Sequence, residues 1–341
     1  MYKENLFFKI FMNSSKMIIM LILLMSTIFT FSNNSWMINW MLMEINLFSF
    51  IPLLANKNSF SSESLMKYFF IQTICSLMLF MFIIFMWNKM MNNQFSINMM
   101  NLCLLMKLGS APLHYWFIQI IESLSWMNLF LISTWQKIIP MIMLTYNFNM
   151  NLIMMSIYLN SLIGAIGGIN QTSLRKILGY SSINHISWML ASILINDMIL
   201  ISYLMIYMFM MSYICMMFFN WNINFINQFS FMNNIKLNSM FMVMIFFSLG
   251  GLPPFLGFLP KWLTINFLIM NNFIMTNLFM IMCSLIVLYF YLMTIMQFLL
   301  FNNFKNKWFL KFNNNKLNFM KFNLLLITSM SLPIMMFLYL Y

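Results

Sequence analysis

The chain alternates long apolar runs with short clusters of Asn, Ser, Lys and Pro. An α-helix rises ~1.5 Å per residue, so about 20 apolar residues cross the ~30 Å hydrocarbon layer of a membrane. The apolar runs therefore predict eleven transmembrane helices. They are expected at residues 17–32, 36–54, 65–87, 97–122, 127–147, 151–168, 172–195, 198–219, 238–271, 275–300 and 320–341.

Two of these runs are too long for one span, and each contains a helix-breaking cluster. Residues 109–112 (GSAP) interrupt the run at 97–122, and residues 250–254 (GGLPP) interrupt the run at 238–271. Proline removes a helical hydrogen bond, and glycine lowers the cost of unwinding. Unwound backbone at membrane depth is tolerated only where it is buried in protein or lines a water-filled cavity. Both helices are therefore expected to be broken beside a functional path.

The positions of the breaks predict an internal repeat. Each break falls in the fourth helix of a group of five, within residues 17–147 and within residues 151–300. Because five is odd, the two groups would be inverted repeats, an architecture in which discontinuous helices mark an ion or substrate path. The sequence thus predicts an all-α polytopic membrane protein with a tail at 1–16, two inverted five-helix repeats, a basic Asn-rich loop at 301–319 and a last helix at 320–341.

Composition excludes a soluble globular domain. The 341 residues are 63% hydrophobic and 6% charged, whereas about a quarter of the residues of a soluble domain are charged. Abundant Met, Phe, Ile and Asn, with the single arginine Arg175, indicate a genome rich in A and T, such as an organellar genome. The four cysteines lie singly in apolar runs, which argues against a disulfide framework and against a metal or iron–sulfur site.

The net charge of +12 follows membrane topology and does not indicate nucleic acid binding. Alternating the predicted helices across the membrane places thirteen Lys and Arg residues on the N-terminal side and only Lys89 on the other. Positively charged connections face the compartment of synthesis. We therefore expect the N-terminus on that side, with no removable targeting peptide, and the C-terminus on the opposite side. The basic loop is expected to attract anionic phospholipid such as cardiolipin.

Four charged residues within the predicted helices suggest a function. Lys107 lies ten residues inside its run, too deep for its side chain to reach the surface, and Lys137 and Lys261 also lie at membrane depth. A lysine there costs at least ~2.5–3.5 kcal/mol, which makes a functional role the default hypothesis. Glu44, in the middle of its run, matches Lys107 in depth. We predict a Glu44–Lys107 ion pair; the alternative is a bond from Glu44 to a backbone carbonyl or to water.

These charges predict a lateral proton relay. A dry site disfavours a charged lysine and a nearby carboxylate favours it, so movement of Glu44 relative to Lys107 would switch whether the lysine holds its proton. The negative end of a half-helix favours the ammonium of Lys107, whereas Lys261 begins a half-helix, whose positive end disfavours it. Lys137 has no carboxylate partner visible in the sequence.

Other polar and small residues allow more than one interpretation. His114 and His185 could be hydrogen-bonded packing residues or relay steps, because histidine titrates near neutral pH. Glu63 precedes Lys67 by four residues, which favours a local structural pair. Gly164 begins a cluster of glycines that favours close helix packing.

Five segments of the chain resemble a known family. They read MEINLFSFIPLL, LLMKLGSAPLHYWF, STWQKIIP, GAIGGINQTSLRKILGYSSINHISWM and SLGGLPPFLGFLPKW. Together they are similar to the subunit 2 family of mitochondrial NADH dehydrogenase (respiratory complex I), one of the antiporter-like proton-pumping subunits. The resemblance implies two inverted five-helix repeats. It also implies a coupling pair at Glu44 and Lys107, a central relay at Lys137, a lysine towards the exit at Lys261, and relay or hydrated-axis positions at both histidines.

The resemblance further implies a multi-pass protein of the mitochondrial inner membrane, with its N-terminus on the matrix side and its C-terminus on the intermembrane-space side. Its partners would be other membrane-arm subunits of complex I. This chain would bind no cofactor, since FMN, iron–sulfur clusters and ubiquinone belong to the whole complex. The alternatives are a standalone cation/proton antiporter of related fold, which the organellar composition disfavours, and a structural membrane scaffold, which leaves the buried charges unexplained.

Overall fold

A computed structural model of the chain describes residues 14–55, 59–89, 92–228 and 236–301. Over these residues the backbone is almost entirely helical, and the only extended pairing is an isolated bridge between two connections. Six of the described helices are long and apolar enough to cross a membrane by length and composition: Trp36–Leu54, Phe60–Trp87, Trp126–Tyr146, Met150–Gly168, Asp197–Trp221 and Ile274–Met296.

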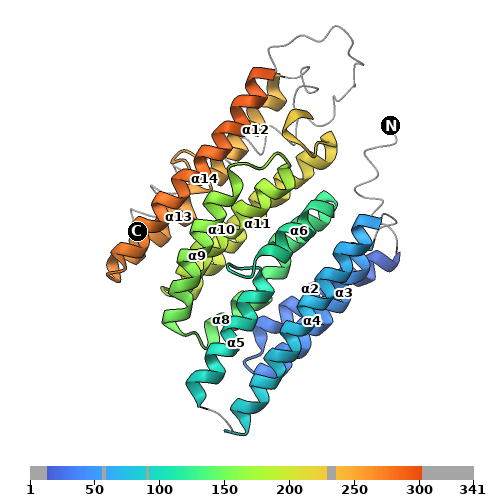
Figure 1. Cartoon of the computed structure of the whole chain (residues 1–341), viewed down its shortest axis with the longest axis vertical. Coiled ribbons are helices and arrows are strands. Elements are labelled where there is room, and N and C mark those ends of the chain that lie inside the picture. Colours follow the sequence, from blue (N-terminus) through green and yellow to red (C-terminus); the bar gives the residue numbers. More distant parts are fainter. Residues whose placement is uncertain (1–13, 56–58, 90–91, 229–235, 302–341) are drawn as a thin grey trace. The chain divides into compact units, whose positions relative to one another are not determined.

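The chain divides into two compact units, Met1–Ile153 and Met154–Tyr341. In the first unit, α3 packs against α2 and α4, while α5 packs against α4 and α8. Figure 1 shows α2, α3 and α4 running side by side. The helices of this unit are α2 (Ser14–Ser32), α3 (Trp36–Leu54), α4 (Ser59–Trp87), α5 (Asn93–Leu108), α6 (Tyr115–Ser123), α7 (Trp126–Phe130), the π-helix η1 (Leu131–Trp135) and α8 (Gln136–Tyr146).

The continuous run from α7 to α8 is the innermost helical segment of the first unit. Its most apolar stretch is 72% buried, against 28% for the corresponding stretch of α4, which exposes several large apolar side chains. A helix that buries all its faces must satisfy or exploit its polar residues within the protein. Polar groups on α8 are therefore held by protein contacts.

The second unit is built around α10, which is buried along nearly its whole length and contacts α11, α13 and α14. The predicted close packing at Gly164 is confirmed, because a Cβ there would lie 2.7 Å from the backbone nitrogen of Asn184 on α10. The helices are α9 (Met150–Gly168), which starts at the end of the first unit, α10 (Leu174–Ile193), α11 (Asp197–Trp221), α12 (Lys236–Gly250), α13 (Phe258–Met270) and α14 (Ile274–Phe301).

The predicted spans within the described residues coincide with helices, and both predicted breaks are present. The earliest starts differ by a few residues, because polar residues extend α2 and α4 at their N-terminal ends. The last predicted helix at 320–341, residues 302–319 of the basic loop and residues 1–13 of the tail lie outside the described residues. The π-helical turn at Leu131–Trp135 has no counterpart in the sequence prediction.

Both breaks use the same helix-ending geometry. At the end of α5, Gly109 has φ +70° and the amide of Ser110 donates to the carbonyl of Leu105 at 3.1 Å. At the end of α12, Gly251 has φ +80° and the amide of Leu252 donates to the carbonyl of Phe247 at 3.1 Å. This is the Schellman motif, in which a left-handed glycine lets the chain turn away while the last carbonyls stay bonded.

Candidate functional site

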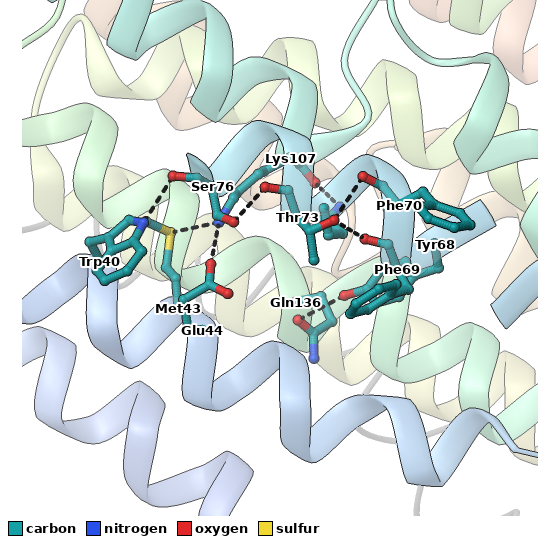
Figure 2. A network of polar contacts seen from close by, with 11 residues as sticks. Trp40, Met43, Glu44, Tyr68, Phe69, Phe70, Thr73, Ser76, Lys107 and Gln136 are labelled. Atoms are coloured by element: carbon teal, nitrogen blue, oxygen red, sulfur yellow. Dashed lines mark hydrogen bonds and ion pairs between the residues drawn. The ribbon is translucent and has the colours of Figure 1, made fainter. Parts of the chain in front are cut away.

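The predicted pairing of Glu44 with Lys107 is confirmed. Lys107 lies in the last turn of α5, directly before the break, and Glu44 lies in the middle of α3. The Lys107 Nζ and Glu44 Oε1 atoms are 3.9 Å apart (Figure 2). The lysine side chain is 4% exposed and the carboxylate side chain 18% exposed, so most of the pair is shielded from water.

This ion pair is open and is not a hydrogen bond. Charge-assisted N–H···O hydrogen bonds are ~2.7–2.9 Å long, about 1 Å shorter than the Glu44–Lys107 distance. Glu44 Oε1 is buried and has no hydrogen-bond partner among the described residues, while the Lys107 ammonium also lies 3.9 Å from Met43 Sδ. A small displacement of α3 or a single intervening water would therefore change how strongly the carboxylate stabilises the ammonium.

Lys137, in the first turn of α8, is buried to 2% exposure. Its ammonium lies 5.1 Å from the ring centroid of Phe117, a cation–π arrangement. Phe117 belongs to α6, just after the break, and packs against Gly109, where an added Cβ would meet the Phe117 side chain at 3.0 Å. The break thus positions the ring that faces Lys137.

Two small cavities lie beside Lys107, and one of them also reaches Lys137. One, of ≈ 20 Å³, is lined by both Lys107 and Lys137. A second, also of ≈ 20 Å³, extends from Lys107 towards Met43 and Asn46 on α3. Each has room for about one water molecule, which needs two to four polar partners. The two cavities share four lining residues: Tyr68, Gln72, Lys107 and Gln136.

Neutral polar side chains around the cavities form a hydrogen-bonded group. Gln136 Nε2 donates to Asn46 Oδ1 at 3.0 Å, and the Tyr68 hydroxyl donates to Gln136 Oε1 at 3.4 Å. Gln72 Nε2 donates to the Lys107 carbonyl at 3.3 Å. Figure 2 shows Tyr68 and Gln136 facing each other beside Lys107. Helices α3, α4 and α8 each contribute one residue to the hydrogen-bonded group Asn46–Tyr68–Gln136, so this group connects the three helices.

The backbone around Gln136 departs from a regular α-helix on both sides. The π-helical turn Leu131–Trp135 ends immediately before it, and π-bulges in helices frequently occur at functional sites. Pro140 follows four residues later and also lines the second cavity. Because proline has no N–H, it cannot donate to the Gln136 carbonyl. Lys137 therefore lies in a short segment where the helical ladder is altered twice.

In the second unit, the prediction that the positive end of a half-helix disfavours the Lys261 ammonium was wrong. Lys261 lies near the start of α13, but its Nζ donates to the carbonyls of Gly250 at 3.0 Å and Leu249 at 3.4 Å, the last carbonyls of α12. The ammonium therefore occupies the negative end of one half-helix, which stabilises it. The long side chain crosses the break, and the ring of Trp188 lies 6.0 Å away.

The two histidines occupy different surroundings. His185 is buried on α10, one turn before Trp188, and its Nδ1 is 2.8 Å from the Tyr203 hydroxyl on α11. His114 lies at the first break, where its Nδ1 is 3.1 Å from the Pro112 carbonyl and its ring stacks on Tyr115 at 4.5 Å. These contacts satisfy a packing role and leave the relay role of both histidines a prediction.

Three charged residues outside the lysine site make contacts with nearby groups. The Glu63–Lys67 pair is confirmed at 2.7 Å, but both side chains are exposed, and such pairs contribute little. Arg175 Nη2 donates to Asn224 Oδ1 at 2.8 Å and so links the first turn of α10 to the segment that follows α11. The four cysteines are buried and free.

Sequence reasoning missed the neutral members of the site, Asn46, Tyr68, Gln72 and Gln136. Each is a polar residue inside a predicted membrane span, and Gln136 is next to Lys137 in the chain. A search for uncharged polar residues at membrane depth would have selected them, because such groups need partners there. Their mutual contacts join residues up to 90 positions apart.

Comparisons with known proteins identify relatives over most of the chain. The family described as NADH:quinone oxidoreductase/Mrp antiporter, transmembrane, matches residues 32–287. NADH-ubiquinone oxidoreductase chain 2 of Anopheles gambiae is 41% identical over 315 residues, covering 89% of this chain and 92% of the relative. The protein of the same name from Locusta migratoria is 38% identical, with 89% and 91% covered.

Solved structures share the fold. A chain of respiratory complex I from Thermus thermophilus with bound aureothin has a TM-score of 0.75 at 16% identity, covering 82% of this chain and 69% of that one. A chain of the Mrp complex from Dietzia has a TM-score of 0.73 at 14% identity, with 82% and 59% covered. From the family match and the two chain 2 relatives it follows that this multi-pass membrane protein belongs to the NADH-ubiquinone oxidoreductase chain 2 family.

Proposed function

We propose that this chain is a membrane-arm subunit of mitochondrial NADH:ubiquinone oxidoreductase and that it moves protons through its own buried Glu, Lys and His residues. The observation that carries this proposal is the open Glu44–Lys107 pair, placed beside a cavity that Lys137 also lines. Buried charges are expensive in a membrane helix. A carboxylate that moves relative to one lysine, beside a cavity that can hold water and reaches a second lysine, explains these buried charges as parts of a proton path.

The first unit would work as follows. When Glu44 approaches Lys107, the carboxylate stabilises the ammonium and the lysine holds a proton. When Glu44 withdraws, the ammonium in its dry site is destabilised, and the proton passes along the cavity towards Lys137. The Phe117 ring stabilises the ammonium that forms there. Electron transfer elsewhere in the complex would drive the movement of α3.

The second unit would hold the corresponding later step at Lys261 and His185. Lys261 has a fixed partner in the carbonyls at the end of α12, and His185 has a hydroxyl partner in Tyr203. The shared Schellman geometry of the two breaks supports two inverted five-helix repeats, 17–147 and 151–300, followed by a last helix. In this arrangement eleven helices place the N-terminus in the matrix and the C-terminus in the intermembrane space.

The partners would be neighbouring membrane-arm subunits, with anionic phospholipid at the basic loop. FMN, iron–sulfur clusters and ubiquinone would be bound elsewhere in the complex, and the present chain would contribute proton movement alone. The Mrp resemblance shows that the same fold occurs in an antiporter complex. The 41% identity to a chain 2 protein favours the respiratory subunit over a standalone antiporter.

Replacement of Lys137 by Met tests the relay in the assembled complex. The substitution removes a buried charge, so the helix should insert and the complex should assemble. Inner-membrane vesicles containing the variant should oxidise NADH with an artificial acceptor at the normal rate but translocate fewer protons per NADH when quinone is the acceptor.

Lys67→Met is the matched control, because Lys67 is exposed and its pair is on the surface. It should leave the proton stoichiometry unchanged. A Lys137→Met complex that assembles and translocates protons at the full stoichiometry would refute the relay.

A further inference from the structure

The two cavities around Lys107 are lined by neutral polar groups as well as by lysines. Their shared wall includes the Tyr68 hydroxyl and the amides of Gln72 and Gln136. All three groups are uncharged at neutral pH. Their common property is that they can hold water by donating and accepting hydrogen bonds at once.

Gln136 lines both cavities and contacts both α3 and α4. Its amide has two N–H donors and an oxygen with two lone pairs. One donor is used by Asn46 and one lone pair by Tyr68. One donor and one acceptor therefore remain for a water molecule in the cavities, which are otherwise walled largely by apolar side chains and the lysines.

The orientation of the Gln136 amide is fixed by its two partners. Asn46 Oδ1 accepts, so the amide nitrogen must point to α3, and the Tyr68 hydroxyl then donates to the amide oxygen. Tyr68 is itself held by ring contacts with Phe50 at 5.4 Å and Trp116 at 6.1 Å. Asn46 lies two residues after Glu44 on α3, so a movement of α3 that carries Glu44 would also carry the hydrogen-bond partner of the Gln136 amide.

We propose that Gln136, held by Asn46 and Tyr68, is a positioning residue that orients the water through which Lys107 and Lys137 exchange a proton. The step balances as a relay: an N–H bond of Lys107 breaks as an O–H bond of the water forms, while another O–H bond of that water breaks as an N–H bond forms on neutral Lys137. Gln136 neither gains nor loses a proton. The inference rests on the proposed function of the two lysines.

Gln136→Met tests this assignment in the intact complex in inner-membrane vesicles. Methionine has a similar length and volume but cannot hold water, so we expect normal assembly and a proton translocation rate at least about tenfold lower, since the water loses its orienting hydrogen bonds. In D2O the residual rate should show a larger solvent isotope effect than the unchanged complex, because the proton transfer becomes limiting. A structural role alone would not change the isotope effect.

Two further variants keep the test decisive. Tyr68→Phe removes a single oxygen and should change the rate and isotope effect in the same direction but less. Met143→Leu replaces a fully buried residue on the same helix, outside both cavities, and should change neither.

The outcomes separate this inference from the function on which it rests. If Lys137→Met lowers the proton stoichiometry while both Gln136→Met and Tyr68→Phe keep the normal rate and isotope effect, the relay stands and the positioning role is wrong. If Lys137→Met itself translocates normally, the proposed function fails first. If Gln136→Met does not assemble, the Tyr68→Phe result alone supports or overturns the inference.

Discussion

Neutralising Glu44 should remove most of the attraction that keeps Lys107 charged. At the observed separation of 3.9 Å, two unit charges interact by about 4 kcal/mol at an effective dielectric constant of ~20. This is an upper value, because the Glu44 side chain is 18% exposed and water screens part of the field. Glu44→Gln keeps the shape and loses the charge. It should weaken the stabilisation of the Lys107 ammonium by up to about that amount.

A double-mutant cycle on proton translocation measures this coupling directly. Glu44→Gln and Lys107→Met should each slow translocation in inner-membrane vesicles. If the carboxylate acts only through the lysine, the double variant should be no slower than the slower single variant, because the second change removes nothing further. Multiplicative losses in the double variant would show that the two residues act independently and would refute the pairing as a functional unit.

Glu63→Gln is the matched control for this experiment. The Glu63–Lys67 distance of 2.7 Å is shorter than the Glu44–Lys107 distance, but both side chains are exposed. If burial decides the effect, removing the shorter pair should leave translocation unchanged. Equal losses from the two substitutions would show that an unspecific change of charge is responsible.

Two smaller predictions concern the second unit. Gly251→Ala forces a side chain into a φ of +80° and places its Cβ 2.9 Å from the Lys261 side chain. It should destabilise the unit by at least about 1–2 kcal/mol, measured as a lower temperature of heat inactivation. The neighbouring Gly250→Ala, whose nearest contact would be 3.5 Å, should not lower this temperature. Tyr203→Phe removes the hydroxyl 2.8 Å from His185 Nδ1 and should cost about 1 kcal/mol in heat stability, and it should lower proton stoichiometry only if His185 belongs to the relay.

The sequence was sufficient for features that depend on local composition. Apolar length located the helices, and the Gly and Pro clusters located both breaks, because these depend on neighbouring residues in the chain. Glu44 was found because a buried lysine needs a counter-charge and only five acids are available. This reasoning works where a charge is so expensive that the possible partners are few.

Contacts between neutral groups and the direction of a long side chain could not be predicted in the same way. The Gln136–Asn46 bond joins residues 90 positions apart, and many other amides in the chain could satisfy Gln136 equally well. The π-helical turn before Gln136 depends on packing against other helices. Lys261 lies near the start of α13 as predicted, but its ammonium binds the end of α12 because the side chain is long enough to cross the break.

The contacts of the Lys261 ammonium help to explain how a chain with five acids holds three deeply buried lysines. Lys107 lies in the last turn of α5, and the Lys261 ammonium binds the last carbonyls of α12, so each lies at the negative end of a half-helix created by a break. Lys137 faces a ring packed against the first break. The helix ends are backbone features, and the Phe117 ring packs against one of them, so these partners are held in place by the breaks. Glu44 is the partner that approaches a lysine from a separate helix without a hydrogen bond to hold it, and variation of the field at Lys107 should therefore come from α3.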